Sequence, residues 1–176
     1  KQVAELVGER ITLMGQTLQR NEIVAEWSDA ERALEAGLYH LRHLVQAWKP
    51  ILSKDILNRS MCYLADVLMS LFLDQLSKAT DISTDASQFV HSLFSKATHD
   101  LLVFFVDSKT KHSRVWERFV AICKFMNMSL SDVQVGLADG VFRSVTGPEL
   151  SKVVTSCFDD SPRRKSVLKS LSQTSQ

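Results

Sequence analysis

An all-α fold is predicted for this chain of 176 residues by three features of its sequence. Apolar residues recur at intervals of three and four along most of the chain, which is the period of one helix face. Helix-start and helix-stop signals divide these patterns into separate elements. No stretch alternates convincingly between apolar and polar residues, as a half-buried strand would. We therefore expect an elongated bundle of about five long helices followed by three short C-terminal helices.

The central element of the predicted bundle is a helix over residues 51–79. Its apolar side chains follow one face at first and cover nearly all faces in the middle. Such a helix must be surrounded by other helices or by lipid. Arg59 and Asp66 interrupt the run well short of the ~20 apolar residues that a membrane span needs. We therefore interpret it as the packing centre of the bundle, with Cys62 and Tyr63 as part of the packing.

Four other long helices are expected around this centre. Ser28 begins a capping box before the second helix, and Ser113 is the expected cap of the fifth. Pro50 forces a break or a sharp kink before the central helix, so the second helix and the central helix form either a hairpin or one long helix bent near Lys49. In chain order, the four helices cover residues 2–20, 28–48, 86–104 and 113–127.

Shorter helices are expected from Ser129 onward. Ser129 begins a capping-box motif, and Gly140 is a typical stop signal after the helix that follows. Pro148 and Pro162 each lie in the first turn of a further short helix, where the missing N–H costs little. Three short helices therefore close the predicted bundle.

The domain organisation expected from these elements is a single helical domain over residues 1–176. Residues 1–128 would form the long-helix bundle, and residues 129–172 the short-helix end. The chain begins at Lys1, without Met and within the first apolar pattern, so we expect it to be a fragment of a longer protein.

The composition argues against several classes of function. Twenty-one basic and 20 acidic side chains give a formal net charge of +1, whereas a nucleic-acid binder normally carries a basic excess. The three cysteines are far apart in apolar helical patterns, which predicts buried thiols in a reducing compartment. No glycine-rich phosphate loop, nucleophile elbow or Cys-x-x-Cys motif occurs. We therefore expect no enzyme activity, no cofactor and no nucleic-acid partner.

Histidines provide the one candidate for metal chemistry. His40 and His43 lie one turn apart on the second predicted helix, a spacing that can bind a metal ion. A di-iron bundle also needs Glu-x-x-His pairs, and the sequence has none. His91 and His99 have no cysteine near them in the sequence. A metal-dependent helical-bundle enzyme using His40 and His43 is one alternative function, and a self-associating coiled coil of the first two helices is another.

Two basic segments are candidate partner-binding sites. The second of them lies in the first turn of the last helix, where each positive charge opposes the helix macrodipole by ~0.3–1 kcal/mol. Either Asp159 and Asp160 offset these charges locally, or the basic residues are retained for an acidic partner. The candidate residues are Lys109, Lys111 and Arg114 before the fifth helix, and Arg163, Arg164 and Lys165 in the last.

Several stretches of the chain resemble the C-terminal region of the Zeste-white-ten family. The resemblance runs from about Tyr39 to the end and departs at residues 106–114, where family members have a longer, proline-bearing loop. The matching stretches are Trp48-Lys-Pro-Ile-Leu52, the helix around Met61, Asp81-Ile-Ser-Thr84, Trp116 to Phe119, Ala138-Asp-Gly140, and Phe158 followed by Arg163-Arg164.

This resemblance implies a non-catalytic scaffold, similar in architecture to the rod-like subunits of vesicle tethers. Family members serve in a kinetochore complex with Rough Deal and Zwilch, which brings dynein–dynactin to kinetochores and supports the spindle checkpoint. They also serve in an endoplasmic-reticulum tether for Golgi-derived vesicles. The resemblance implies that this end docks the large α-solenoid subunit of each complex, Rough Deal or its vesicle-tether counterpart. It further implies a cytoplasmic protein without membrane insertion, peripheral at the endoplasmic reticulum in interphase and at the kinetochore and spindle in mitosis.

Overall fold

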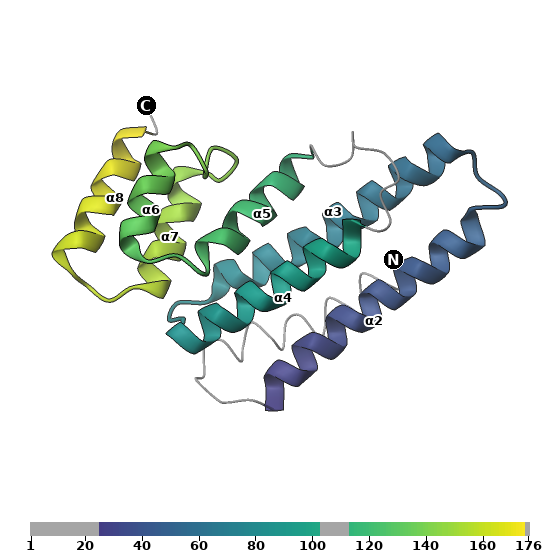
Figure 1. Cartoon of the computed structure of the whole chain (residues 1–176), viewed down its shortest axis with the longest axis horizontal. Coiled ribbons are helices and arrows are strands. Elements are labelled where there is room, and N and C mark those ends of the chain that lie inside the picture. The colour runs from purple at the N-terminus through teal and green to yellow at the C-terminus, as the bar shows by residue number, and fades with distance from the viewer. Residues whose placement is uncertain (1–24, 103–112, 175–176) are drawn as a thin grey trace.

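The computed structural model describes residues 25–102 and 113–174, and these ranges contain seven helices and no strand (Figure 1). The all-α prediction is therefore confirmed. The predicted helix 2–20 lies outside the described residues. The helices are α2 (Ala25–Trp48), α3 (Lys54–Lys78), α4 (Thr84–Leu102), α5 (Arg114–Phe125), α6 (Leu130–Ala138), α7 (Gly147–Cys157) and α8 (Pro162–Thr174).

Of the two predicted arrangements, the hairpin is present, and its turn is longer than the sequence suggested. The N–H groups of Ile51 and Leu52 both donate to the carbonyl oxygen of Trp48, at 3.0 and 2.8 Å. This turn includes Pro50, which lacks an N–H and disfavours a helical residue before it. The central helix therefore begins at Lys54, and the prediction that it begins at residue 51 is wrong.

Most predicted helix starts are confirmed by their caps. The Ser113 side chain accepts from the Trp116 N–H at 3.0 Å, and Ser129 forms the complete capping box. The start predicted at Ser28 is wrong, because α2 already begins at Ala25. Alanine and glutamate are strong helix formers, so the residues just before Ser28 favour continuing the helix over ending it.

The core of the protein forms around the C-terminal half of α3, which packs against α2, α5 and α7. Phe72 of α3, Phe94 of α4 and Phe119 of α5 make an aromatic cluster, in which the Phe94 and Phe119 rings are stacked with centroids 4.3 Å apart. This cluster confirms α3 as the packing centre. The buried residues of α3 are Met61, Ala65, Leu68, Met69, Phe72, Leu73, Gln75 and Leu76.

The N-terminal part of α3 is not covered in the same way. Tyr63 is 68% exposed and Ile56 is 53% exposed, so the prediction that Tyr63 belongs to the packing is wrong. By length and composition alone, α3 is the one helix in the described ranges that could cross a membrane, and 33% of its most apolar stretch is buried. Its packing as the centre of the bundle assigns the buried part of this stretch to the protein core.

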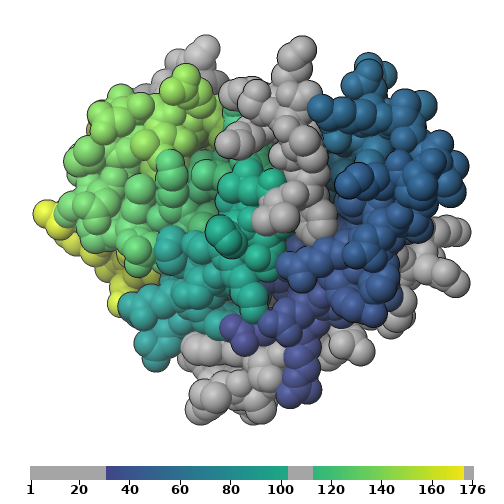
Figure 2. Space-filling model, turned by 45° about the vertical axis from the view of Figure 1, so that its right-hand side comes forward, coloured from purple at the N-terminus to yellow at the C-terminus, as the bar shows by residue number. Residues whose placement is uncertain are grey.

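The short-helix end, α6 to α8, is joined to the long helices by hydrogen bonds at the end of α3. The buried hydroxyl of Ser156 in α7 donates to the Ala79 carbonyl at 3.0 Å, and the Ile82 N–H donates to the Ser156 carbonyl at 2.8 Å. Gly140 ends α6 with a φ of +69°, a left-handed conformation that glycine adopts without strain. Figures 1 and 2 place the short-helix end and the α2–α3 hairpin at opposite ends of the molecule.

Candidate interaction surfaces

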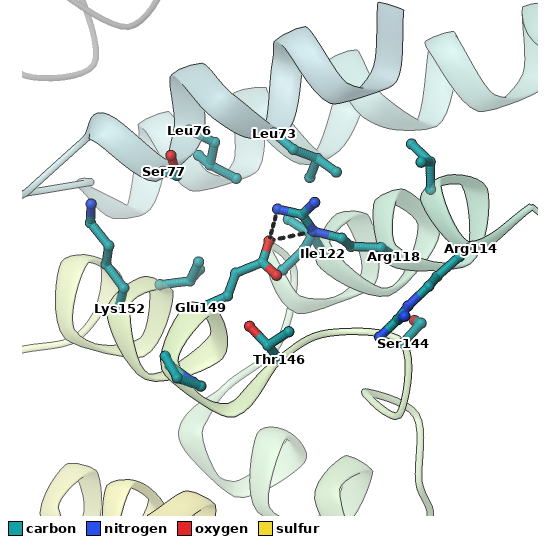
Figure 3. A pocket seen from close by; sticks show the side chains of 13 residues that line it. Leu73, Leu76, Ser77, Arg114, Arg118, Ile122, Ser144, Thr146, Glu149 and Lys152 are labelled. Carbon is teal, nitrogen blue, oxygen red and sulfur yellow. Dashed lines mark hydrogen bonds and ion pairs between the residues drawn. The ribbon is translucent and has the colours of Figure 1, made fainter. Parts of the chain in front are cut away.

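A groove of about 580 Å³ lies between the end of α3, α5 and the start of α7. Figure 3 shows Arg118 of α5 and Glu149 of α7 meeting inside it, with Leu73 and Leu76 of α3 above them. The Arg118 Nη2 and Nε atoms lie 2.6 and 2.7 Å from Glu149 Oε1. The Glu149 side chain is only 15% exposed, so this ion pair is partly shielded from water and holds α5 to α7.

The groove carries an excess of positive charge. Its lining includes Arg114, Arg118 and Lys152 against Glu149, three basic residues and one acid, which gives a local charge of +2. Arg114 and Lys152 lie toward opposite ends of it in Figure 3. The apolar residues at its base are buried, since Ile122 is 1% exposed, whereas Val115 is half-buried and Pro148 is exposed in its lining. The groove therefore combines an excess of positive charge, which is complementary to acidic side chains of a partner, with accessible apolar surface.

Of the first predicted basic segment, Arg114 is described, and it lines this groove. Lys109 and Lys111 lie outside the described residues. Their role in partner binding stays a prediction.

Arg164, a predicted binding residue, is held inside the turn between α7 and α8. Its Nη1 donates to the carbonyl oxygen of Phe158 at 2.6 Å, and its Nη2 lies 3.0 Å from Asp160 Oδ1. The side chain is 17% exposed, and its Nε is buried without a hydrogen-bond partner. These contacts satisfy the carbonyl of Phe158, the residue that caps the C-terminus of α7, and give Arg164 an internal structural role.

Arg163 and Lys165 lie on the surface beside it. Arg163 donates to the Ser131 hydroxyl of α6 at 3.0 Å, and Lys165 Nζ lies 3.2 Å from Asp160 Oδ2. The hydrogen bond from Lys165 and the charge of Arg164 hold the pKa of Asp160 below its usual range. Asp160 thus pairs with two of the three basic side chains, Arg164 and Lys165, and contact of Arg163 or Lys165 with a partner stays a prediction.

Arg164→Ala is expected to lower the free energy of unfolding by about 1–2 kcal/mol, because it removes charge-assisted hydrogen bonds that close the α7–α8 turn. Arg163→Ala is the matched control and should change it by less than ~0.5 kcal/mol, as exposed sites usually do. Urea unfolding of both variants measures the difference. Equal losses in the two variants would contradict the internal role of Arg164.

His40 and His43 are brought together with an aromatic ring. The Tyr39 ring centroid lies 5.9 Å from that of His40 and 4.2 Å from that of His43, in edge-on geometry. Within the described ranges, no group of three His, Cys, Asp or Glu residues is placed to hold a metal ion. The arrangement around these histidines is thus an exposed aromatic contact on α2.

A contact that the sequence did not reveal joins α4 to the end of α5. Cys123 Sγ lies 3.8 Å from His91 Nδ1, so the statement that His91 has no cysteine nearby holds for the sequence and not for the fold. His91 Nδ1 is 2.8 Å from the Cys123 carbonyl and must donate to it, while the Ser87 hydroxyl donates to the Met126 carbonyl at 2.6 Å. In the sequence, Ser87, His91 and Ser95 recur every four residues, and this polar row on one helix face was the signal that could have indicated the contact.

The contact between His91 and Cys123 has a structural role and is not arranged as a nucleophile with its base. Burial raises the pKa of the Cys123 thiol and is the largest of the effects on that pKa. A raised pKa disfavours the nucleophilic thiolate. Since His91 Nδ1 donates to a carbonyl, that nitrogen has no lone pair to accept the thiol proton. His91 instead satisfies a carbonyl at the C-terminus of α5, where backbone acceptors lack helical partners.

A third surface, which we name the hairpin surface, lies at the turn between α2 and α3 and on the first turns of α3. It combines the apolar side chains of Ile51, Ile56 and Tyr63 with the basic side chains of Lys49, Lys54 and Arg59. All six are exposed. It is the largest gathering of exposed large apolar side chains among the described residues, since only Tyr39 and Val135 are exposed elsewhere.

The family model of the ZW10 C-terminal helical domain matches residues 32–171, most of the chain. No curated protein matches the sequence. The family match confirms the resemblance to the Zeste-white-ten family, and it covers all of α3 to α7 and most of α2 and α8. The chain therefore belongs to the family of ZW10 C-terminal helical domains, which are non-catalytic helical scaffolds of multisubunit complexes.

Proposed function

We propose that this domain is an adaptor that docks a large α-solenoid subunit of a multisubunit complex. The observation that carries the proposal is the family match over residues 32–171. The surfaces described above also support the proposal. Polar contacts between helices, such as the pair Arg118–Glu149, stabilise the fold, whereas the exposed faces carry apolar and basic side chains to which a partner can bind. A single core that runs from Leu34 to Leu171 supports the further proposal that residues 1–176 form one domain.

The specific partners follow from the resemblance to the Zeste-white-ten family. They are a solenoid subunit of the Rough Deal type at kinetochores, together with Zwilch, and its counterpart in the vesicle tether at the endoplasmic reticulum. In this proposal the domain supports dynein–dynactin recruitment and the spindle checkpoint in mitosis. In interphase it supports tethering of Golgi-derived vesicles. The protein is cytoplasmic and peripheral at these sites.

Purification of the full-length protein from interphase and mitotic cells tests the proposal. We expect a large helical-repeat subunit to co-purify in both states, with kinetochore components present only in mitosis. Binding of the purified solenoid subunit to the full-length protein then shows whether the contact is direct. Absence of any solenoid subunit from both preparations would overturn the adaptor function.

A further inference from the structure

We propose that the hairpin surface binds an acidic amphipathic helix of a partner protein. The inference deepens the adaptor function by assigning the docking surface and the chemistry of the docked segment, and it rests on that function. Three independent properties of the surface support it: uncovered apolar side chains, an excess of basic side chains, and a helix N-terminus without a side-chain cap.

The apolar side chains follow from a mismatch between sequence and packing. The apolar pattern of α3 extends over the whole helix, but its first buried residue is Met61. Ile56 and Tyr63 are seven residues apart, which places them on the same face of α3 about 10 Å from each other along the axis. Ile51, in the turn before them, is 78% exposed. Ile56 and Tyr63 have the i, i+7 spacing of two anchors on one helix face, along which a second helix can pack.

Basic residues lie close to these apolar side chains along the chain. Lys49 lies in the turn, Lys54 at the start of α3, and Arg59 one helical turn from both Ile56 and Tyr63. Lys49, Lys54 and Arg59 are exposed against one acid, Asp55, so three positive charges and one negative charge leave +2 at this surface. The whole chain carries only +1, so the remainder of the protein is nearly neutral or slightly acidic. In the described part of the chain, no ion pair involves any of these basic side chains. A partner with acidic flanks would therefore be electrostatically complementary.

The N-terminus of α3 adds to this preference. Ser53 occupies the N-cap position, but its side chain makes no capping hydrogen bond. The first-turn N–H groups of a helix lack helical acceptors and carry the positive end of the macrodipole. A partner carboxylate could accept from them, as Asp132 and Ser129 do for α6. All three properties thus favour a segment that carries both apolar and acidic side chains.

A protein segment fits these observations better than an anionic membrane. Each basic residue near an anionic surface contributes about 1 kcal/mol, so the three residues here would give only weak membrane binding. The apolar part of the surface is Ile51 in the turn and only two side chains of α3, Ile56 and Tyr63. Membrane surfaces usually bind the continuous apolar face of a free amphipathic helix. A helix packed along Ile56 and Tyr63 would in contrast remove both from water.

Photo-crosslinking of the full-length protein in cells tests the chemistry of the occupant. Benzoylphenylalanine in place of Tyr63 is expected to join one main partner segment, with apolar residues at helical spacing and an excess of Asp and Glu. The same probe in place of Val135, which is 60% exposed on α6 at the other end, is the control and should not join that segment. Crosslinks from position 63 to a second copy of this chain, to lipid, to a basic or neutral segment, or to nothing would overturn the inference.

Affinity measurements then test the surface itself. The probe is the crosslinked partner segment, made as a synthetic peptide, and the full-length protein carries Ile56→Asp with Arg59→Glu. We expect at least roughly tenfold weaker binding, while the matched control with Val135→Asp and Lys169→Glu binds as the unaltered protein does. Binding of the unaltered protein should also weaken with added salt. We call the protein with Ile56→Asp and Arg59→Glu the hairpin variant. Vesicles of equal parts phosphatidylcholine and phosphatidylserine should bind the hairpin variant and the control variant as they bind the unaltered protein. Weaker vesicle binding by the hairpin variant alone would overturn the inference in favour of a membrane.

The two proposals can fail separately. If the hairpin variant binds the purified solenoid subunit as tightly as the unaltered protein, the hairpin surface is not the docking site and the adaptor function stands. If no solenoid subunit co-purifies but position 63 still joins an acidic helix of another protein, the adaptor function fails as stated and the surface assignment stands.

Discussion

Phe72→Asp is expected to unfold the domain. Phe72 is 1% exposed and its ring lies 5.7 Å from that of Phe94 and 6.4 Å from that of Phe119. Removing a buried phenylalanine side chain costs about 3–5 kcal/mol, and burying an unpaired carboxylate adds several more. Because a whole domain is stable by only about 5–15 kcal/mol, the sum is comparable to the total stability. Circular dichroism and thermal melting should show lost helicity or no cooperative transition.

Two further variants make this test specific. Leu68→Asp, at another buried position of α3, should have the same effect. Tyr63→Asp introduces the same charge on the same helix at a position that is 68% exposed, so it should change stability by less than about 1 kcal/mol. A soluble Phe72→Asp variant with an unchanged melt would show that α3 is not the packing centre. If Tyr63→Asp unfolded the domain as Phe72→Asp does, the N-terminal part of α3 would be buried after all.

Local signals in the sequence were sufficient to predict most helix boundaries. The caps at Ser113 and Ser129 and the stop at Gly140 depend on interactions within four or five residues. Such interactions are determined by residue type and spacing alone. The centre of the bundle was predictable for a similar reason, because a helix that is apolar on several faces must be packed on several faces.

The extent of that packing could not be predicted in the same way. The apolar period of α3 shows which residues favour burial, but the lengths and positions of α2, α5 and α7 decide which of them are covered. Ile56 and Leu68 have the same apolar character in the sequence, yet one is 53% and the other 6% exposed. The excess of apolar residues over covered positions is the feature that identifies a candidate binding surface.

Contacts between distant residues were also beyond the sequence. His91 and Cys123 are 32 residues apart, and Arg118 and Glu149 are 31 apart. Each contact depends on how two helices cross, which helix periodicity does not determine. The charges of Arg163 and Arg164 look equivalent in the sequence, but only the fold places the guanidinium of Arg164 against the Phe158 carbonyl. Sequence reasoning therefore identified the basic segment and could not divide it into internal and surface residues.

Alkaline pH is expected to destabilise the domain through its buried and half-buried thiols, and the half-buried Cys157 contributes most. This side chain packs against the core at the end of α7. Burial raises its pKa from the ordinary value of 9.0 to about 12. Between these two values the folded state keeps a proton that the unfolded state releases. Stability is therefore retained below about pH 9 and falls as the pH rises above it.

The expected loss from Cys157 is about 1.4 kcal/mol on going from about pH 8 to about pH 10, since each unit of pKa difference corresponds to about 1.36 kcal/mol. Cys157→Ala removes this titration. Between the two pH values, the variant should therefore lose less stability than the unaltered protein, and the difference between the two losses should equal the contribution of Cys157. Cys62→Ala is the matched control, because Cys62 is also half-buried but burial raises the pKa of its thiol less than that of Cys157, so this variant should relieve a smaller part of the loss. Denaturant unfolding in reducing buffer at both pH values measures each difference. If the unaltered protein and Cys157→Ala lost stability equally, the thiolate of Cys157 would have access to water, and the packing at the end of α7 would be looser than the structure shows.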